Sequence, residues 1–129
     1  GGVMEEIVVT HVKDCEWKKN DLYGNLRWKY LVDNTQSSSH GLSCGILKIP
    51  VSGELKLHHH DPQEIYLIRS GEALLLKSDG HTEKVFKDSV VYIPMGFSHG
   101  LKNIGNSFLE LLWIFPTNCW NEVEYQFET

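Results

Sequence analysis

The chain has 129 residues, of which 41% are hydrophobic and 22% charged, with 12 basic against 17 acidic side chains. This composition is typical of one soluble globular domain, not of a disordered or membrane protein. The net charge of −5 and the lack of a basic cluster argue against a nucleic-acid partner. No apolar run approaches the roughly 20 residues of a membrane helix, and no secretory signal begins the chain, so we expect a cytosolic protein without a membrane partner.

Short apolar and β-branched runs recur along the chain, each closed by Gly, Pro, Asn, Asp or Ser. No segment keeps apolar residues at helical spacing for three turns, which predicts an all-β sandwich or barrel with a helical turn near residues 15–20. The predicted strands cover residues 6–12, 27–32, 41–49, 54–60, 64–69, 72–77, 83–86, 90–93, 99–103 and 108–115.

We expect a single domain made of an N-terminal strand and arm (1–26), a barrel (27–116) and a C-terminal tail (117–129). The predicted strand 108–115 is apolar on both faces, which implies that its outer face is covered and favours a homodimer. The polar loop 33–40 has no periodicity, and its role stays open. Three widely spaced cysteines indicate packing residues, because they form neither a C-x-x-C pair nor a disulfide framework.

The stretch Leu57-His58-His59-His60 places three histidines in succession near the end of a predicted strand. Because side chains alternate along a strand, His58 and His60 share one face and His59 takes the other. Asp61-Pro62 then forces a turn, since proline cannot continue a ladder. In the next strand Glu64 and Tyr66 share a face, and a tight hairpin would bring that face alongside the two histidines.

Two imidazoles and a carboxylate are donors that a divalent transition metal prefers. An H-x-H motif alone is weak, because it also occurs on exposed strand ends. A distant segment supplies a further donor: a strand is followed by a Pro94-x-Gly96 turn, His99 and a return strand. Strand alternation places Lys56 on the same face as His58 and His60. There it either meets a substrate carboxylate or lies on the surface.

The spacings His58-x-His60-x3-Glu64-x6-Gly71 and Pro94-x-Gly96-x2-His99-x3-Asn103 together resemble the two motifs of the cupin superfamily. The resemblance implies a double-stranded β-helix, a jelly-roll-like barrel. It also implies one divalent transition metal (iron, manganese, nickel or zinc) bound by His58, His60, Glu64 and His99. Asp88 stands where the second motif usually opens with glycine, a departure that affects a turn and not a ligand.

A closer resemblance covers residues 27–125. The chain is similar to the small single-domain cupin lyases of marine bacteria that cleave dimethylsulfoniopropionate. That family's functional tyrosines, one of which is the base, would correspond to Tyr66 and Tyr125. The resemblance is carried by Arg27-Trp28-Lys29-Tyr30-Leu31, Glu64-Ile65-Tyr66, Val90-Val91-Tyr92-Ile93, Trp113-Ile114-Phe115-Pro116-Thr117 and Glu122-Val123-Glu124-Tyr125.

This resemblance implies a small-molecule carboxylate substrate and a β-elimination that yields dimethyl sulfide and acrylate. A metal on the carboxylate would act as a Lewis acid, and Tyr66 would act as base after its pKa had been lowered by the cation. Aromatic faces can hold a sulfonium by cation–π attraction, although core packing is the alternative role of each ring. The candidates are Trp28, Tyr30, Trp113 and Tyr125.

Two other functions fit the same motifs. Three histidines and a glutamate also suit an iron-dependent dioxygenase, which would need O₂ where an elimination does not. A cupin can also bind a metal or small ligand without catalysis, because fold does not fix function.

Overall fold

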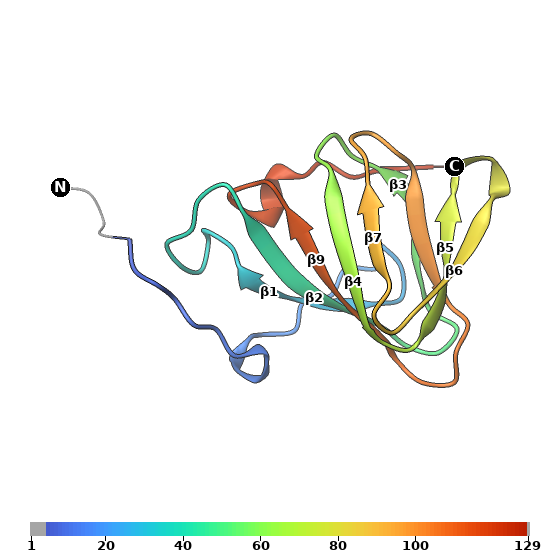
Figure 1. The fold of residues 1–129 in the computed structure, drawn as a ribbon, viewed down its shortest axis with the longest axis horizontal. Coiled ribbons are helices and arrows are strands. Elements are labelled where there is room, and N and C mark those ends of the chain that lie inside the picture. Colours follow the sequence, from blue (N-terminus) through green and yellow to red (C-terminus); the bar gives the residue numbers. More distant parts are fainter. Residues whose placement is uncertain (1–4, 129) are drawn as a thin grey trace.

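The computed structural model describes residues 5–128. In this part of the chain two antiparallel five-stranded sheets face each other, in the orders β1-β2-β9-β4-β7 and β10-β3-β8-β5-β6 (Figure 1). The strands are β1 (Arg27–Val32), β2 (Ser43–Ile49), β3 (Glu54–His59), β4 (Glu64–Ser70), β5 (Glu72–Lys77), β6 (Thr82–Phe86), β7 (Val90–Ile93), β8 (His99–Asn103), β9 (Leu109–Phe115) and β10 (Gln126–Phe127). The all-β double-stranded β-helix expected from the sequence is confirmed.

The chain crosses between the sheets at nearly every connection, and this corrects the predicted hairpin after the histidines. β3 pairs with β8 and β10, whereas β4 pairs with β7 and β9 in the other sheet. The turn at Asp61-Pro62 therefore carries the chain across the barrel and does not fold it back along the same sheet. Glu64 consequently faces the histidines from the opposite wall.

The barrel core is built from alternate residues of the strands. In β9, which lies in the middle of its sheet, Leu109, Leu111, Trp113 and Phe115 are buried. This alternation settles which face of the apolar strand points inward, a choice that the sequence left open. The outward-facing residues of β9 are only partly buried, and the homodimer inferred from them stays a prediction.

The N-terminal segment differs from the expectation. The described residues 5–11 form no strand, and Ile7 is 98% exposed. Two hydrogen bonds between Lys18 and Trp28 join residue 18, and not residues 6–12, to the edge of β1. A single 3-10 turn lies at Val12–Asp14 instead of within residues 15–20.

The C-terminal tail folds over one end of the barrel. In Figure 1 the red segment runs across the upper ends of the strands towards the C-terminus. It ends in β10, which pairs with His58 and His59 of β3. The tail thereby covers the end of the barrel at which the histidines lie. Across residues 5–128, none of the helical segments has the length and apolar character needed to cross a membrane.

Candidate functional site

Two adjoining strands and the opposite sheet bring the predicted ligands together. His58 on β3 is the cross-strand partner of His99 on β8. His60 follows the end of β3, and Glu64 opens β4 in the facing sheet. One donor atom from each of the three histidines lies within 4.8 Å of the others. All four residues are at most 2% exposed, so solvent has little access to their donor atoms.

Main-chain hydrogen bonds orient the three imidazoles. Each Nδ1 lies 2.7–2.9 Å from a carbonyl oxygen two residues away in the chain. A carbonyl oxygen only accepts, so each Nδ1 carries the proton and the neutral ring keeps a lone pair on Nε2. This backbone support is the arrangement that fixes the tautomer of metal-binding histidines.

The carboxylate completes a set of donors that fits a cation. Glu64 Oε1 lies 3.1 Å from His60 Nε2 and 3.3 Å from His99 Nε2. With the protons on Nδ1, these contacts bring acceptors together, and a cation between them would make the contacts favourable. Donor atoms about 2.1 Å from one divalent metal lie about 3.0–3.4 Å apart at angles of about 90–109°. Among residues 5–128, Nε2 of His58 and of His99 has no hydrogen-bond partner.

Burial also keeps His58 in the form that binds metal. Desolvation, reinforced by the charge of His99, lowers the pKa of His58 from 6.5 to about 3. The imidazole is therefore neutral at physiological pH. A neutral ring is the species that coordinates a metal.

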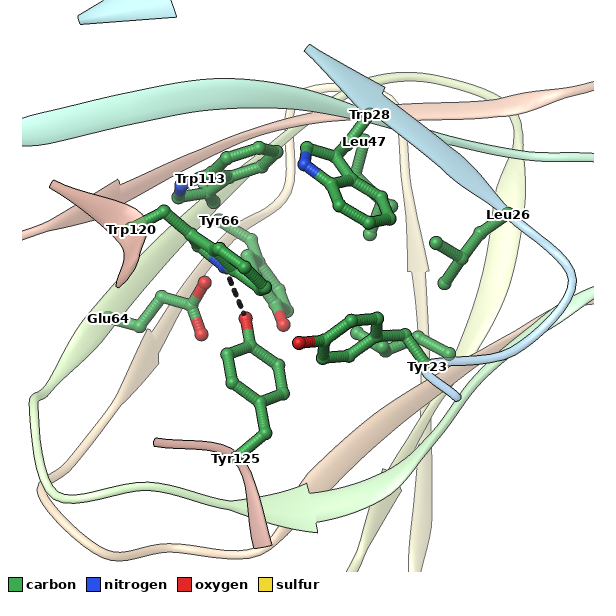
Figure 2. A pocket seen from close by; sticks show the side chains of 10 residues that line it. Tyr23, Leu26, Trp28, Leu47, Glu64, Tyr66, Trp113, Trp120 and Tyr125 are labelled. Atoms are coloured by element: carbon green, nitrogen blue, oxygen red, sulfur yellow. Dashed lines mark hydrogen bonds between the residues drawn. The ribbon is translucent and has the colours of Figure 1, made fainter. Parts of the chain in front are cut away.

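An aromatic pocket adjoins this centre (Figure 2). Figure 2 shows the hydroxyl groups of Tyr23, Tyr66 and Tyr125 directed into one space, beside the carboxylate of Glu64. The indole Nε1 of Trp120 donates a hydrogen bond of 3.2 Å to the Tyr125 hydroxyl. The pocket is lined by Tyr23, Leu26, Trp28, Leu47, Leu55, Glu64, Tyr66, Trp113, Trp120 and Tyr125.

The two tyrosines expected from the resemblance both lie at this pocket. Tyr66 is 1% exposed, and its ring centroid lies 6.0 Å from that of His99. Burial and then the negative charge of Glu64 raise the pKa of Tyr66 well above 10, and the same two causes raise the pKa of Tyr125. Both phenols therefore stay protonated unless a positive charge enters the site.

The candidate substrate-binding residues occupy different places. Trp28 and Trp113 line the pocket. Tyr30 is buried behind them, edge-on to Trp113 with centroids 6.5 Å apart. Lys56 is exposed and outside the pocket, which corrects the expectation that it shares the face of His58. The register of β3 shifts between Leu55 and His58, so side-chain alternation does not hold across Lys56.

Two further residues of the pocket, Tyr23 and Trp120, were not predicted from the sequence. Trp120 lies close to Tyr125 in the aromatic tail, and this proximity in the sequence could have predicted that Trp120 also lies at the pocket. Tyr23 lies in an irregular segment without periodicity. The following Gly24 has φ +135° and forms a bridge with Leu55, where an added Cβ would lie 2.0 Å from the Glu54 carbonyl oxygen. Glycine thus allows the close approach that brings Tyr23 to the pocket.

Comparisons with known proteins agree with the fold and the motifs. The chain is 28% identical to the dimethylsulfoniopropionate lyase DddW of Ruegeria pomeroyi over 105 residues, which are 81% of this chain and 68% of that protein. The polyketide cyclase RemF of Streptomyces resistomycificus has a TM-score of 0.80 at 17% identity, over 98% of this chain and 87% of that one. A predicted oxalate decarboxylase of Thermotoga maritima has a TM-score of 0.73 at 23% identity, over 85% of this chain and 99% of that one.

These structural neighbours share the fold at low sequence identity, so they do not indicate which reaction this protein catalyses. The model of the Cupin domain matches residues 45–115, a span that contains all four predicted ligands. Together with the two facing sheets and the buried histidine cluster, this match shows that the chain belongs to the cupin family.

Proposed function

We propose that the protein is a metal-dependent lyase that cleaves dimethylsulfoniopropionate to dimethyl sulfide and acrylate. The observation that carries the proposal is the contact between the buried histidine and carboxylate set and a pocket walled by tyrosines and tryptophans. The similarity to DddW supports the choice of substrate.

His58, His60, His99 and Glu64 would hold one divalent metal. When bound, such a metal supplies a Lewis acid that stabilises the negative charge developing beside the substrate carboxylate. The surrounding chain fixes the ligand orientations through the three Nδ1 contacts to main-chain carbonyl oxygens. The barrel walls exclude water from the ligands, which strengthens the electrostatic interactions within the site.

Tyr66 is the proposed base. It follows Glu64 by two residues on β4, and both side chains line the pocket. As a phenolate, Tyr66 would remove a proton from the carbon next to the substrate carboxylate. The electron pair of that C–H bond forms the C=C bond of acrylate, and the C–S pair leaves with sulfur as neutral dimethyl sulfide. No oxidant or reductant is consumed.

The aromatic walls suit the sulfonium end of the substrate. Tyr23, Trp28 and Trp120 lie mutually close, with ring centroids 5.3–5.6 Å apart. In the described chain, no lysine or arginine is among the residues that line the pocket. Aromatic faces attract a desolvated cation, whereas a basic side chain would repel it.

The test is an anaerobic assay. The protein is stripped of metal, reloaded separately with iron, manganese, nickel or zinc, and mixed with dimethylsulfoniopropionate, and dimethyl sulfide is measured in the headspace. We expect metal-dependent release that is lost in Tyr66→Phe, while Tyr92→Phe, which changes an exposed tyrosine, keeps full activity.

The assay also tests the rival functions. Stoichiometric metal binding without release of dimethyl sulfide under any loading would refute the lyase. Turnover of another small acid that requires O₂ would then favour a dioxygenase. Full activity of Tyr66→Phe would leave the lyase intact and remove Tyr66 as its base.

A further inference from the structure

A buried carboxylate outside the metal centre ties the loop after β1 to the C-terminal tail. Asp33 is 1% exposed. Its Oδ1 accepts hydrogen bonds from the main-chain N–H and the hydroxyl of Thr35, at 3.0 and 2.5 Å. Its Oδ2 accepts a bond of 2.9 Å from the main-chain N–H of Trp120, 87 residues away.

This carboxylate depends on hydrogen-bond donors alone. Within residues 5–128, Asp33 forms no ion pair. A buried carboxylate that loses one of its hydrogen-bond donors is strongly destabilised, because no water replaces that donor. Asn118 strengthens the same junction, since its main-chain oxygen accepts from Asn34 N and its side-chain oxygen accepts from Gly41 N. The position of Trp120 is thus fixed by the loop 33–40, and not by the tail alone.

From Trp120 the connection continues to the metal centre. The indole Nε1 donates to the Tyr125 hydroxyl at 3.2 Å. The Tyr125 ring in turn stacks on His58 with centroids 4.5 Å apart. Asp33, Trp120 and Tyr125 therefore form one continuous series of contacts between the β1–β2 loop and a proposed metal ligand.

We infer that Asp33 is a positioning residue for the reaction proposed above. By holding the main chain of Trp120, it places the indole N–H that fixes the hydroxyl of Tyr125 at the pocket. Asp33 itself does not touch the pocket. This inference rests on the proposed function, because it gives the loop a role in aligning a tyrosine for that reaction.

A double-mutant cycle tests the inference. Asp33→Asn keeps the shape of the side chain but removes its charge. We expect Asp33→Asn to lower kcat about tenfold, which corresponds to roughly 1.4 kcal/mol of transition-state stabilisation, with metal stoichiometry unchanged. In a Tyr125→Phe background the same change should have no further effect on kcat. Independent, multiplicative losses in the two backgrounds would overturn the inference.

Thr35→Val is the matched control. It removes one hydroxyl donor to Asp33 and leaves the bond to Trp120 in place, so kcat should stay within about twofold of the unmodified protein. A tenfold loss in this variant would mean that any disturbance of the loop lowers the rate, and would overturn the specific role of the Trp120 contact. Should Asp33→Asn fail to fold, Asp33→Glu replaces it in the cycle, because the longer side chain keeps the carboxylate but displaces it from the main-chain N–H of Trp120.

A second readout separates this inference from the proposed function. Nitration of individual tyrosines by tetranitromethane, followed by peptide mass mapping, needs no turnover. We expect Asp33→Asn to speed nitration of Tyr125 by about threefold or more while Tyr92, which is 59% exposed, reacts as before. An unchanged rate at Tyr125 would refute the positioning role. Absence of dimethyl sulfide from the unmodified protein would refute only the lyase.

Discussion

The ring of Tyr125 stacks on the imidazole of His58, with centroids 4.5 Å apart and an interplanar angle of 14°. Tyr125 comes from the C-terminal tail, whereas His58 comes from the middle of the barrel chain. The pairing of β10 with β3 brings them together, since Phe127 is the cross-strand partner of His58. The tail therefore contributes both a wall of the pocket and a packing surface for a proposed ligand.

Tyr125→Phe separates the role of the Tyr125 hydroxyl from that of its ring. It removes the hydroxyl that accepts from Trp120 and keeps the ring that stacks on His58. We expect kcat to fall by about tenfold or more, because this hydroxyl is the group that the contacts of Asp33 and Trp120 hold at the pocket, with metal affinity unchanged. Steady-state kinetics and metal titration measure the two quantities. A Tyr125→Phe protein with full kcat would show that only the ring matters.

Glu64→Gln removes the negative charge from the proposed ligand set. The carboxylate oxygen lies 3.1 and 3.3 Å from Nε2 of His60 and His99, so its charge should stabilise a cation there. Loss of a supporting residue around a metal typically costs 10–100-fold in affinity, and we expect about 100-fold or more for this direct donor. Competition with a chromophoric chelator measures the loss. Glu83→Gln, at an exposed position, is the control and should bind metal normally; equal affinity in Glu64→Gln would remove Glu64 from the ligands.

The metal-free protein should lose stability in mild acid. The pKa of His58 is about 3 in the folded state against 6.5 for the free side chain. Between these values the unfolded state binds more protons, so the contribution of His58 is fully present above pH 6.5 and is lost as the pH falls. We expect a slope of about 1.4 kcal/mol per pH unit from this group.

Urea unfolding of the metal-free protein between pH 6.5 and 4.5 measures this slope. His58→Gln should have a smaller slope, because the titrating group is gone. His81→Gln changes an exposed histidine and should keep the slope of the unmodified protein. Identical slopes in all three proteins would contradict the assignment to His58.

Tyr23→Leu tests the attraction between the pocket and a cation. Tyr23 lies 5.1–5.6 Å from the rings of Trp28, Trp120 and Tyr125. Cation–π contacts in desolvated sites contribute about 1–2 kcal/mol, so KM for the sulfonium substrate should rise about tenfold. Tyr23→Phe keeps the ring and should keep KM. Inhibition by the uncharged thioether analogue of the substrate should change little in Tyr23→Leu; an equal loss for both molecules would mean that Tyr23 acts through shape alone.

Gly45→Ala tests how tightly Trp113 packs in the pocket wall. An added Cβ at Gly45 would lie 2.3 Å from the Lys29 carbonyl oxygen and from two ring carbons of Trp113. We expect a loss of about 1–3 kcal/mol in the free energy of unfolding, because neither neighbour is free to retreat. Gly105→Ala is the control, since its Cβ would meet no atom closer than 3.5 Å. Urea unfolding compares the two, and equal stability would contradict the tight contact.

Several features followed from the sequence alone because they depend on local chemistry. Strands end where turn residues stand, and the bounds Arg27–Val32, Glu72–Lys77, Val90–Ile93 and His99–Asn103 agree with the structure. The ligand spacing is equally local, since alternation along one strand separates His59 from His58 and His60. The motifs therefore predicted the family and the candidate ligands before any tertiary contact was known.

Tertiary structure decided the features that depend on distant partners. The sequence predicted a hairpin after His60, but long-range pairing of β4 with β9 places Glu64 in the facing sheet. The bulge that exposes Lys56 arises from the register between β3 and β8, and the apolar residues 6–12 have no strand partner in the described chain. The link between Asp33 and Trp120 joins residues 87 positions apart. Secondary-structure propensity and side-chain alternation depend on neighbouring residues and carry no information about such distant contacts. Only the folded chain could therefore reveal them.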